Sequence, residues 1–209
     1  MSFSGMLLAL FLVAHMSGNL LILVSHSKFN EYAYLLTSNK LLLFSAEAGL
    51  IALLALHVWM AISVTRRNRA ARPIPYAVTT NSGRSRRWWG SSNMGITGTF
   101  ILLFVIYHLI HFKFGPHYTT VQGETEMRDL AKLVFDEFQK PVEVFLYVAA
   151  MILIGFHLLH GIRSMFDTLG LNQTKWDKTI LRFSYAYVLI VFGGFIIIPL
   201  AIFFLGVGV

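Results

Sequence analysis

The chain has 209 residues, of which 56% are hydrophobic and only 13% are charged. Soluble domains carry about 25% charged residues, so this composition indicates an integral membrane protein. The absence of cysteine excludes disulfides, thiolate-bound iron–sulfur clusters and haem attachment through a C-x-x-C-H motif.

Five apolar segments are long enough to cross a bilayer, which requires roughly 20 residues. They lie at about 3–24, 42–64, 94–112, 142–162 and 183–205. The predicted fold class is therefore an all-α integral membrane protein with five transmembrane helices. We expect residues 1–209 to form one domain, in which the first four helices make a bundle.

The chain has 17 basic and 10 acidic residues, a net charge of +7. The basic residues are distributed unevenly between the two sides of the membrane. The segments between spans two and three and between spans four and five contain 11 of the 17 basic residues and only two acids, Asp167 and Asp177. The basic residues are Arg66, Arg67, Arg69, Arg72, Arg84, Arg86, Arg87, Arg163, Lys175, Lys178 and Arg182. By the positive-inside rule this side faces the cytoplasm, so the N-terminus is expected inside and the C-terminus outside. The charge therefore indicates topology and a docking surface rather than nucleic-acid binding.

Residues 124–140 lie on the opposite, external side between spans three and four. Charged and apolar residues alternate there at helical spacing, ending at Pro141. This pattern predicts an amphipathic helix on the outer membrane surface.

Six of the eight histidines fall within spans one to four, and span five has none. An ionisable side chain inside a span is costly, so it indicates a functional site. The six are His15, His57, His108, His111, His157 and His160. At least one histidine on each of four successive spans is difficult to attribute to helix packing alone.

The histidines sort into two depths. Spans two and four both run toward the cytoplasm, and His57 and His157 lie near their inner ends. Spans one and three run outward, and His15 and His108 lie in their outer halves. Two pairs at two depths are what a four-helix bundle needs to hold two stacked b haems through imidazole ligands, since imidazole is a common metal ligand and this interior has no thiolates.

Two choices of ligand remain open. His111 follows His108 by three residues, and His160 follows His157 by three, so each faces nearly the same direction as its neighbour. We expect His108 and His157, which lie nearer the span interiors, to be the ligands. Gly18, Gly95, Gly98 and Gly161 lie near the ligands and fit either a flat macrocycle or ordinary helix packing.

The segments HMSGNL at His15, LHVWMA at His57, GTFILLFVIYH at His108 and GFHLLHG at His157 resemble the cytochrome b membrane anchor of succinate dehydrogenases and fumarate reductases. The similarity is to the single-chain, five-helix, two-haem type. In that family the ligands of spans two and four hold the haem nearest the catalytic subunits, and those of spans one and three hold the distal haem.

The resemblance implies a subunit of complex II, in the cytoplasmic membrane of a bacterium or archaeon. Its implied partners are a flavoprotein subunit and an iron–sulfur subunit, the latter docked on the Arg-rich face. Two b haems would carry electrons to or from membrane quinone, typically menaquinone, and membrane lipid would surround the chain.

The resemblance also suggests residues around the cofactors. Ser4, Trp89, His160, Arg163 and Arg182 are candidates to contact the propionates of the inner haem. His26 and Glu31, just beyond the outer end of span one, are candidates for the quinone site because quinone chemistry requires proton exchange.

Two other functions fit parts of the pattern. One is a haem-b quinone anchor of the nitrate reductase or formate dehydrogenase type, although these typically use fewer spans. The other is a cofactor-free transporter whose histidines serve packing or proton relay, which leaves the paired depths without an explanation.

Overall fold

The computed structural model describes residues 1–71, 93–171 and 175–207. Among these residues, five helices are long and apolar enough to cross a membrane, which confirms the predicted all-α membrane fold. They are α1 with its continuation η1 (Ser2–Asn19 and Leu20–Leu23), α3 (Lys40–Ala70), α5 with the π-helical η3 (Met94–His108 and Leu109–Lys113), α7 (Pro141–Thr168) and α8 (Asp177–Leu205). Three of them, α3, α7 and α8, extend six residues past one predicted limit, for example α3 to Ala70 rather than to 64.

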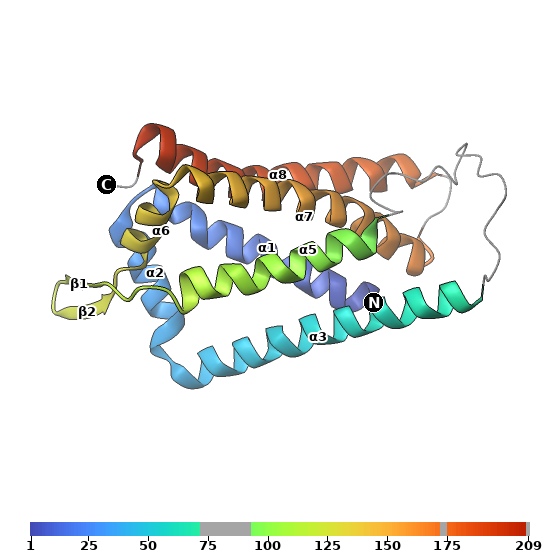
Figure 1. Cartoon of the computed structure of the whole chain (residues 1–209), viewed down its shortest axis with the longest axis horizontal. Helices are drawn as coiled ribbons and strands as arrows, with labels where there is room; N and C mark the ends of the chain where they lie inside the picture. Colours follow the sequence, from blue (N-terminus) through green and yellow to red (C-terminus); the bar gives the residue numbers. More distant parts are fainter. Residues whose placement is uncertain (72–92, 172–174, 208–209) are drawn as a thin grey trace.

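The long helices run along the long axis of the molecule, and the start of α1 and the end of α8 lie toward its opposite ends (Figure 1). We call these the amino end and the carboxyl end of the bundle, after the terminus that each holds. The shorter elements α2, α6 and a small hairpin gather at the carboxyl end (Figure 1).

Local sequence signals set several helix boundaries. The side chain of Asn39 accepts a hydrogen bond of 3.1 Å from the backbone N–H of Leu42 and so caps the start of α3. Pro141 occupies the first turn of α7, where its missing N–H costs no helical hydrogen bond. Gly206 ends α8 with a φ of 60°, a left-handed conformation that glycine adopts without strain.

The segment 124–140 corrects the sequence prediction. Its first part is not helical, because Thr125–Arg128 forms strand β2, which pairs antiparallel with β1 (Thr119–Gln122). The pairing of Gln122 with Thr125 leaves a two-residue turn that begins at Gly123 with a φ of 62°. The glycine and the threonine-rich flanks favour a hairpin over the helix that the charge alternation suggested.

The helix of this segment is limited to α6 (Leu130–Phe138), which is capped by the Asp129 side chain accepting from the backbone N–H of Lys132. Its apolar face does not lie free at the membrane surface, since Ala131, Leu133, Val134 and Phe138 are buried in the protein. A further helix that the sequence analysis did not predict, α2 (His26–Ser38), packs against it.

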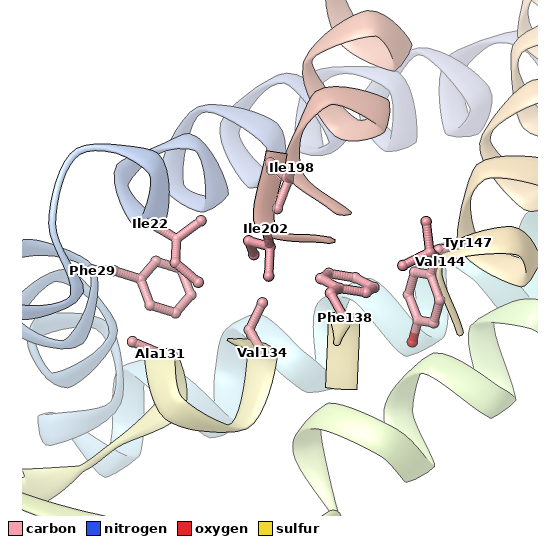
Figure 2. Close-up of a cluster of buried hydrophobic side chains, with 9 residues drawn as sticks. All are labelled: Ile22, Phe29, Ala131, Val134, Phe138, Val144, Tyr147, Ile198 and Ile202. Carbon is pink, nitrogen blue, oxygen red and sulfur yellow. The ribbon is translucent and has the colours of Figure 1, made fainter. Parts of the chain in front are cut away.

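A cluster of buried apolar side chains joins these elements at the carboxyl end (Figure 2). Ile22 of η1, Phe29 of α2, Val134 of α6, Val144 of α7 and Ile202 of α8 all contribute to it. Ile202 is fully buried, so this end of the bundle has an interior like that of a soluble domain.

A second cluster lies deeper in the bundle and joins α1, α7 and α8, and its members are Met16, Ala150, Met151, Ile154, Val191 and Phe192. The fifth span is thus part of the central packing. By contrast, α3 contains no buried residue and packs mainly against α1 and α2. The most extensively buried part of the fold is therefore α1, α7 and α8 together with the layer at the carboxyl end.

Asn30 connects α2 to the start of α6 through buried hydrogen bonds. Its side-chain amide donates to Asp129 Oδ1 at 2.8 Å, and its oxygen accepts from the backbone N–H of Ala131 at 2.9 Å. Since Asn30 is 2% exposed, no solvent can replace these partners.

The substitution Asn30→Leu keeps the side-chain size but leaves the buried N–H of Ala131 without an acceptor. We expect it to lower the free energy of unfolding by about 1–3 kcal/mol, as measured by thermal or denaturant unfolding in detergent. The control is Thr37→Val on the same helix, because the exposed Thr37 hydroxyl bonds only to carbonyls of its own helix. Equal stability of the two variants would contradict the role given to Asn30.

Candidate cofactor-binding site

Two of the predicted ligands, His57 on α3 and His157 on α7, lie toward the amino end of the bundle, and each is held by a hydroxyl group from another helix. Nδ1 of His57 lies 3.2 Å from Ser4 Oγ of α1. Nδ1 of His157 lies 3.0 Å from Thr97 Oγ1 of α5. The structure therefore joins α1 to α3 and α5 to α7 through two similar hydroxyl–imidazole contacts.

The hydroxyl groups are compatible with one tautomer of these two rings. The Ser4 hydroxyl lies 2.8 Å from the backbone carbonyl of Met1, and the Thr97 hydroxyl lies 3.2 Å from the carbonyl of Asn93 and 3.2 Å from that of Met94. When each hydroxyl donates to a carbonyl of its own chain segment, its oxygen can accept the Nδ1–H of the facing imidazole. That arrangement leaves Nε2 of His57 and His157 with a lone pair, which is the form that binds a metal.

The other pair, His15 on α1 and His108 on α5, lies toward the carboxyl end. Their rings are in contact, with centroids 5.8 Å apart and planes at 85°. Nδ1 of His15 lies 3.3 Å from the side-chain amide nitrogen of Asn19, and Nδ1 of His108 lies 3.5 Å from the Tyr147 hydroxyl. Figure 2 shows this hydroxyl pointing from α7 toward α5.

Aromatic side chains surround the same pair. Phe11 stacks on His15 at 5.3 Å, Phe104 stacks on His108 at 6.0 Å, and Phe195 of α8 lies 5.7 Å from His15. The fifth span thus lines this site although it carries no histidine. The surroundings are apolar and aromatic, as a haem pocket requires.

The four residues fit the ligand set of two haems. Among the described residues, Nδ1 of His57, His108 and His157 lies beside a hydroxyl group, and Nδ1 of His15 lies beside the donating amide N–H of Asn19. A bond from imidazole to a metal is about 2 Å long, so two rings on opposite sides of one ion have centroids roughly 6 Å apart. The separation of 5.8 Å between His15 and His108 agrees with this value.

The surroundings of Nδ1 differ between His108 and its neighbour His111. Nδ1 of His111 is buried without a hydrogen-bond partner and faces Glu137 and Glu143. Nδ1 of His108, by contrast, lies 3.5 Å from the Tyr147 hydroxyl. The choice of His108 over His111 and of His157 over His160 as ligands stays a prediction.

The candidates for propionate contacts have different positions. Ser4 is buried against the ring of His57, while Arg163 lies half-buried near His160 and Arg182 is exposed on α8. Trp89 lies outside the described residues.

The two candidates for the quinone site are not brought together in one pocket. Glu31 is exposed on α2, accepts a hydrogen bond from Ser27, and lines an open pocket of about 800 Å³ between α2 and the hairpin. His26 is not among the residues that line this pocket. Its buried Nε2 has no hydrogen-bond partner in the described part of the chain, and its ring lies near Phe135.

The glycines near the histidines also differ in their surroundings. A Cβ on Gly18 would collide with the ring of Tyr32 on α2, so this glycine serves helix packing. A Cβ on Gly98 would lie 3.6 Å from Cε1 of His157, and one on Gly5 would lie 3.3 Å from Cε1 of His57. Gly5 was not singled out from the sequence, yet it gives the His57 ring room beside α1.

Comparison with known proteins gives one family match. A family model described as "Succinate dehydrogenase/Fumarate reductase transmembrane subunit" matches residues 69–198, which is more than half of the chain and includes His108 and His157. No curated protein and no solved structure gives a match.

Proposed function

Because the chain belongs to the succinate dehydrogenase/fumarate reductase transmembrane subunit family, we propose that it is the two-haem cytochrome b anchor of a succinate:quinone oxidoreductase. In this role it transfers electrons between an iron–sulfur subunit and a membrane quinone, which we take to be menaquinone. The observation that supports the haem assignment most strongly is that the rings of His15 and His108 are in contact, while His57 and His157 lie toward the other end of the bundle, each beside a hydroxyl group of a neighbouring helix.

In this proposal the Nε2 atoms of His57 and His157 bind one haem, and those of His15 and His108 bind the other. A b haem supplies one-electron transfer, and the protein sets its position and potential. Ser4 and Thr97 hold the first two rings in the ligand tautomer and increase their basicity by accepting the Nδ1–H. At the other pair, Asn19 and Tyr147 restrict ring rotation.

The distribution of charge supports an orientation with the amino end in the cytoplasm. The last turns of α3 carry Arg66, Arg67 and Arg69, and Arg163 and Arg182 lie on α7 and α8 toward the same end. The positive-inside rule assigns such an end to the cytoplasm. The iron–sulfur subunit would dock there, with the flavoprotein subunit beyond it, and the haem of His57 and His157 would lie nearest to them.

The quinone would react near the opposite pair, at the carboxyl end. The pocket beside Glu31 lies at that end and offers an exposed carboxylate. At the amino end, Arg163 is the best placed candidate for a haem propionate because guanidinium groups pair with carboxylates in a forked geometry.

Family membership favours this function over the two other functions that the sequence pattern allowed. The matched family is neither a transporter family nor the membrane subunit of a nitrate reductase or formate dehydrogenase.

Substitution of the ligands tests the pairing. We expect His57→Ala and His157→Ala to remove the same haem, and His15→Ala and His108→Ala to remove the other, because loss of either axial ligand disrupts one site. Redox titration of the haem absorbance of the purified complex distinguishes the two haems by their potentials. His111→Ala and His160→Ala are matched controls one helical turn away and should retain both haems. If the two substitutions of one pair removed different haems, the pairing would be wrong.

Substitution of Thr97 tests the hydroxyl contact. In Thr97→Val the Nδ1–H of His157 loses its acceptor, so the imidazole becomes a weaker donor to ferric iron. A tenfold loss of affinity for ferric over ferrous haem raises the midpoint potential by about 59 mV. We expect a rise of this order for the haem of His57 and His157 only.

The matched variant Thr97→Ser keeps the hydroxyl and should leave the potential close to that of the native protein. Equal shifts in Thr97→Val and Thr97→Ser, or a shift confined to the other haem, would refute the proposed contact.

A further inference from the structure

A second group of metal-binding side chains lies at the carboxyl end, apart from the four proposed haem ligands. His111 of η3, Glu137 of α6 and Glu143 at the start of α7 each offer a ligand atom, and these atoms all lie within 4.8 Å of one another. The two carboxylate side chains are each 13% exposed, and that of His111 is 23% exposed. Three separate elements therefore direct their polar groups to one point.

Among the described residues, not every polar atom of this cluster has a hydrogen-bond partner. His111 Nδ1 lies 3.7 Å from an oxygen of Glu137 and 3.7 Å from an oxygen of Glu143, which is too long for a hydrogen bond. His111 Nδ1 and Glu137 Oε2 are both buried and have no hydrogen-bond partner. An unpaired buried polar atom is costly, so a missing partner is expected between them.

Neighbouring side chains hold the carboxylates in place. Lys140 Nζ donates to Glu137 Oε1 at 2.8 Å, and the Tyr107 hydroxyl donates to Glu143 Oε2 at 2.6 Å. The Tyr107 ring also lies on that of His111, with centroids 4.2 Å apart. Such outer contacts are typical of metal sites, where they fix the orientation of the ligands.

We propose that His111, Glu137 and Glu143 bind a divalent transition-metal ion of the Zn²⁺ class. Bonds of 2.0–2.2 Å in a tetrahedral site place ligand atoms roughly 3.3–3.6 Å apart, close to the 3.7 Å from His111 Nδ1 to each carboxylate, and the two carboxylates lie within 4.8 Å of each other. With a neutral imidazole, the two carboxylates and Lys140 sum to one negative charge, which attracts a cation. The imidazole selects Zn²⁺ and related ions over Mg²⁺ and Ca²⁺, and water completes the coordination.

The ion would join three elements beside the carboxyl-end pair of histidines. His111 follows His108 by one helical turn, while Glu137 and Glu143 flank the junction between α6 and α7. Binding would therefore fix the end of α5 against the layer that covers the bundle at this end.

Zinc binding to the purified, chelator-treated complex in detergent tests the proposal. With Zn²⁺ alone as probe, in competition with a fluorescent chelator, we expect one site per chain, weakened at least tenfold in Glu137→Gln and in Glu143→Gln. The matched control is Asp136→Asn, since Asp136 is a neighbouring carboxylate on α6 that pairs with Lys132. Its zinc affinity should equal that of the native protein.

X-ray absorption at the zinc edge of the native complex gives a second measurement that does not depend on the folding of any variant. We expect only nitrogen and oxygen ligands, one of them an imidazole. Several imidazole ligands, the same affinity in all variants, or no binding at micromolar zinc would each overturn the proposal. The last result would mean that the three side chains share a proton instead of an ion.

Discussion

The hydrocarbon interior of a membrane offers no water to a polar side chain, and this constraint governs the arrangement of the histidines. Each imidazole inside the bundle needs a polar partner from the protein or from a bound group. The structure provides one partner at Nδ1 for each of four rings, contributed by Ser4, Asn19, Thr97 and Tyr147. At His57 and His157 the facing hydroxyl oxygen can accept the Nδ1–H, which leaves the lone pair at Nε2. At His15 the Asn19 amide N–H donates to Nδ1, so the hydroxyl contacts support ligation through Nε2 at His57 and His157, and His15 would bind through its other tautomer.

The packing of the helices complements this chemistry. The central contacts of α1, α7 and α8 and the buried cluster at the carboxyl end provide a fixed frame. Two of the four imidazoles, His15 and His157, lie on helices of that frame, while their partners His57 and His108 lie on α3 and α5. α3 buries no residue. Each proposed ligand pair thus has one histidine on a well-packed helix and one on a less buried helix. Such a pair is well suited to enclose a bulky cofactor.

Much of this architecture could be predicted from the sequence, because it depends on the lengths of segments and on distances along the chain. The length of each apolar segment identified the five spans, and the distance of each histidine from the nearest charged loop assigned its depth. The contact of Asn19 with His15 was accessible too, since residues four apart share a helix face. Thr97 and Tyr147 carried no such signal, because their contacts depend on how two helices pack.

The layer at the carboxyl end was the least predictable part. The charge alternation in 124–140 matched a helical period, but Gly123 and the flanking threonines favoured a hairpin in the first part. Helix α2 was not recognised because its sequence lacks a long apolar run. The cluster of His111, Glu137 and Glu143 arises only when α5, α6 and α7 meet, so no spacing in the sequence reveals it.

The haem content of the purified complex tests the central claim most directly. A pyridine haemochrome assay, normalised to the amount of this chain, measures b haem independently of activity or partner turnover. Two haems per chain is the predicted result, since four ligands in two pairs define two sites. One haem would mean that one pair is structural, and a folded complex without haem would contradict the assignment of the four histidines altogether.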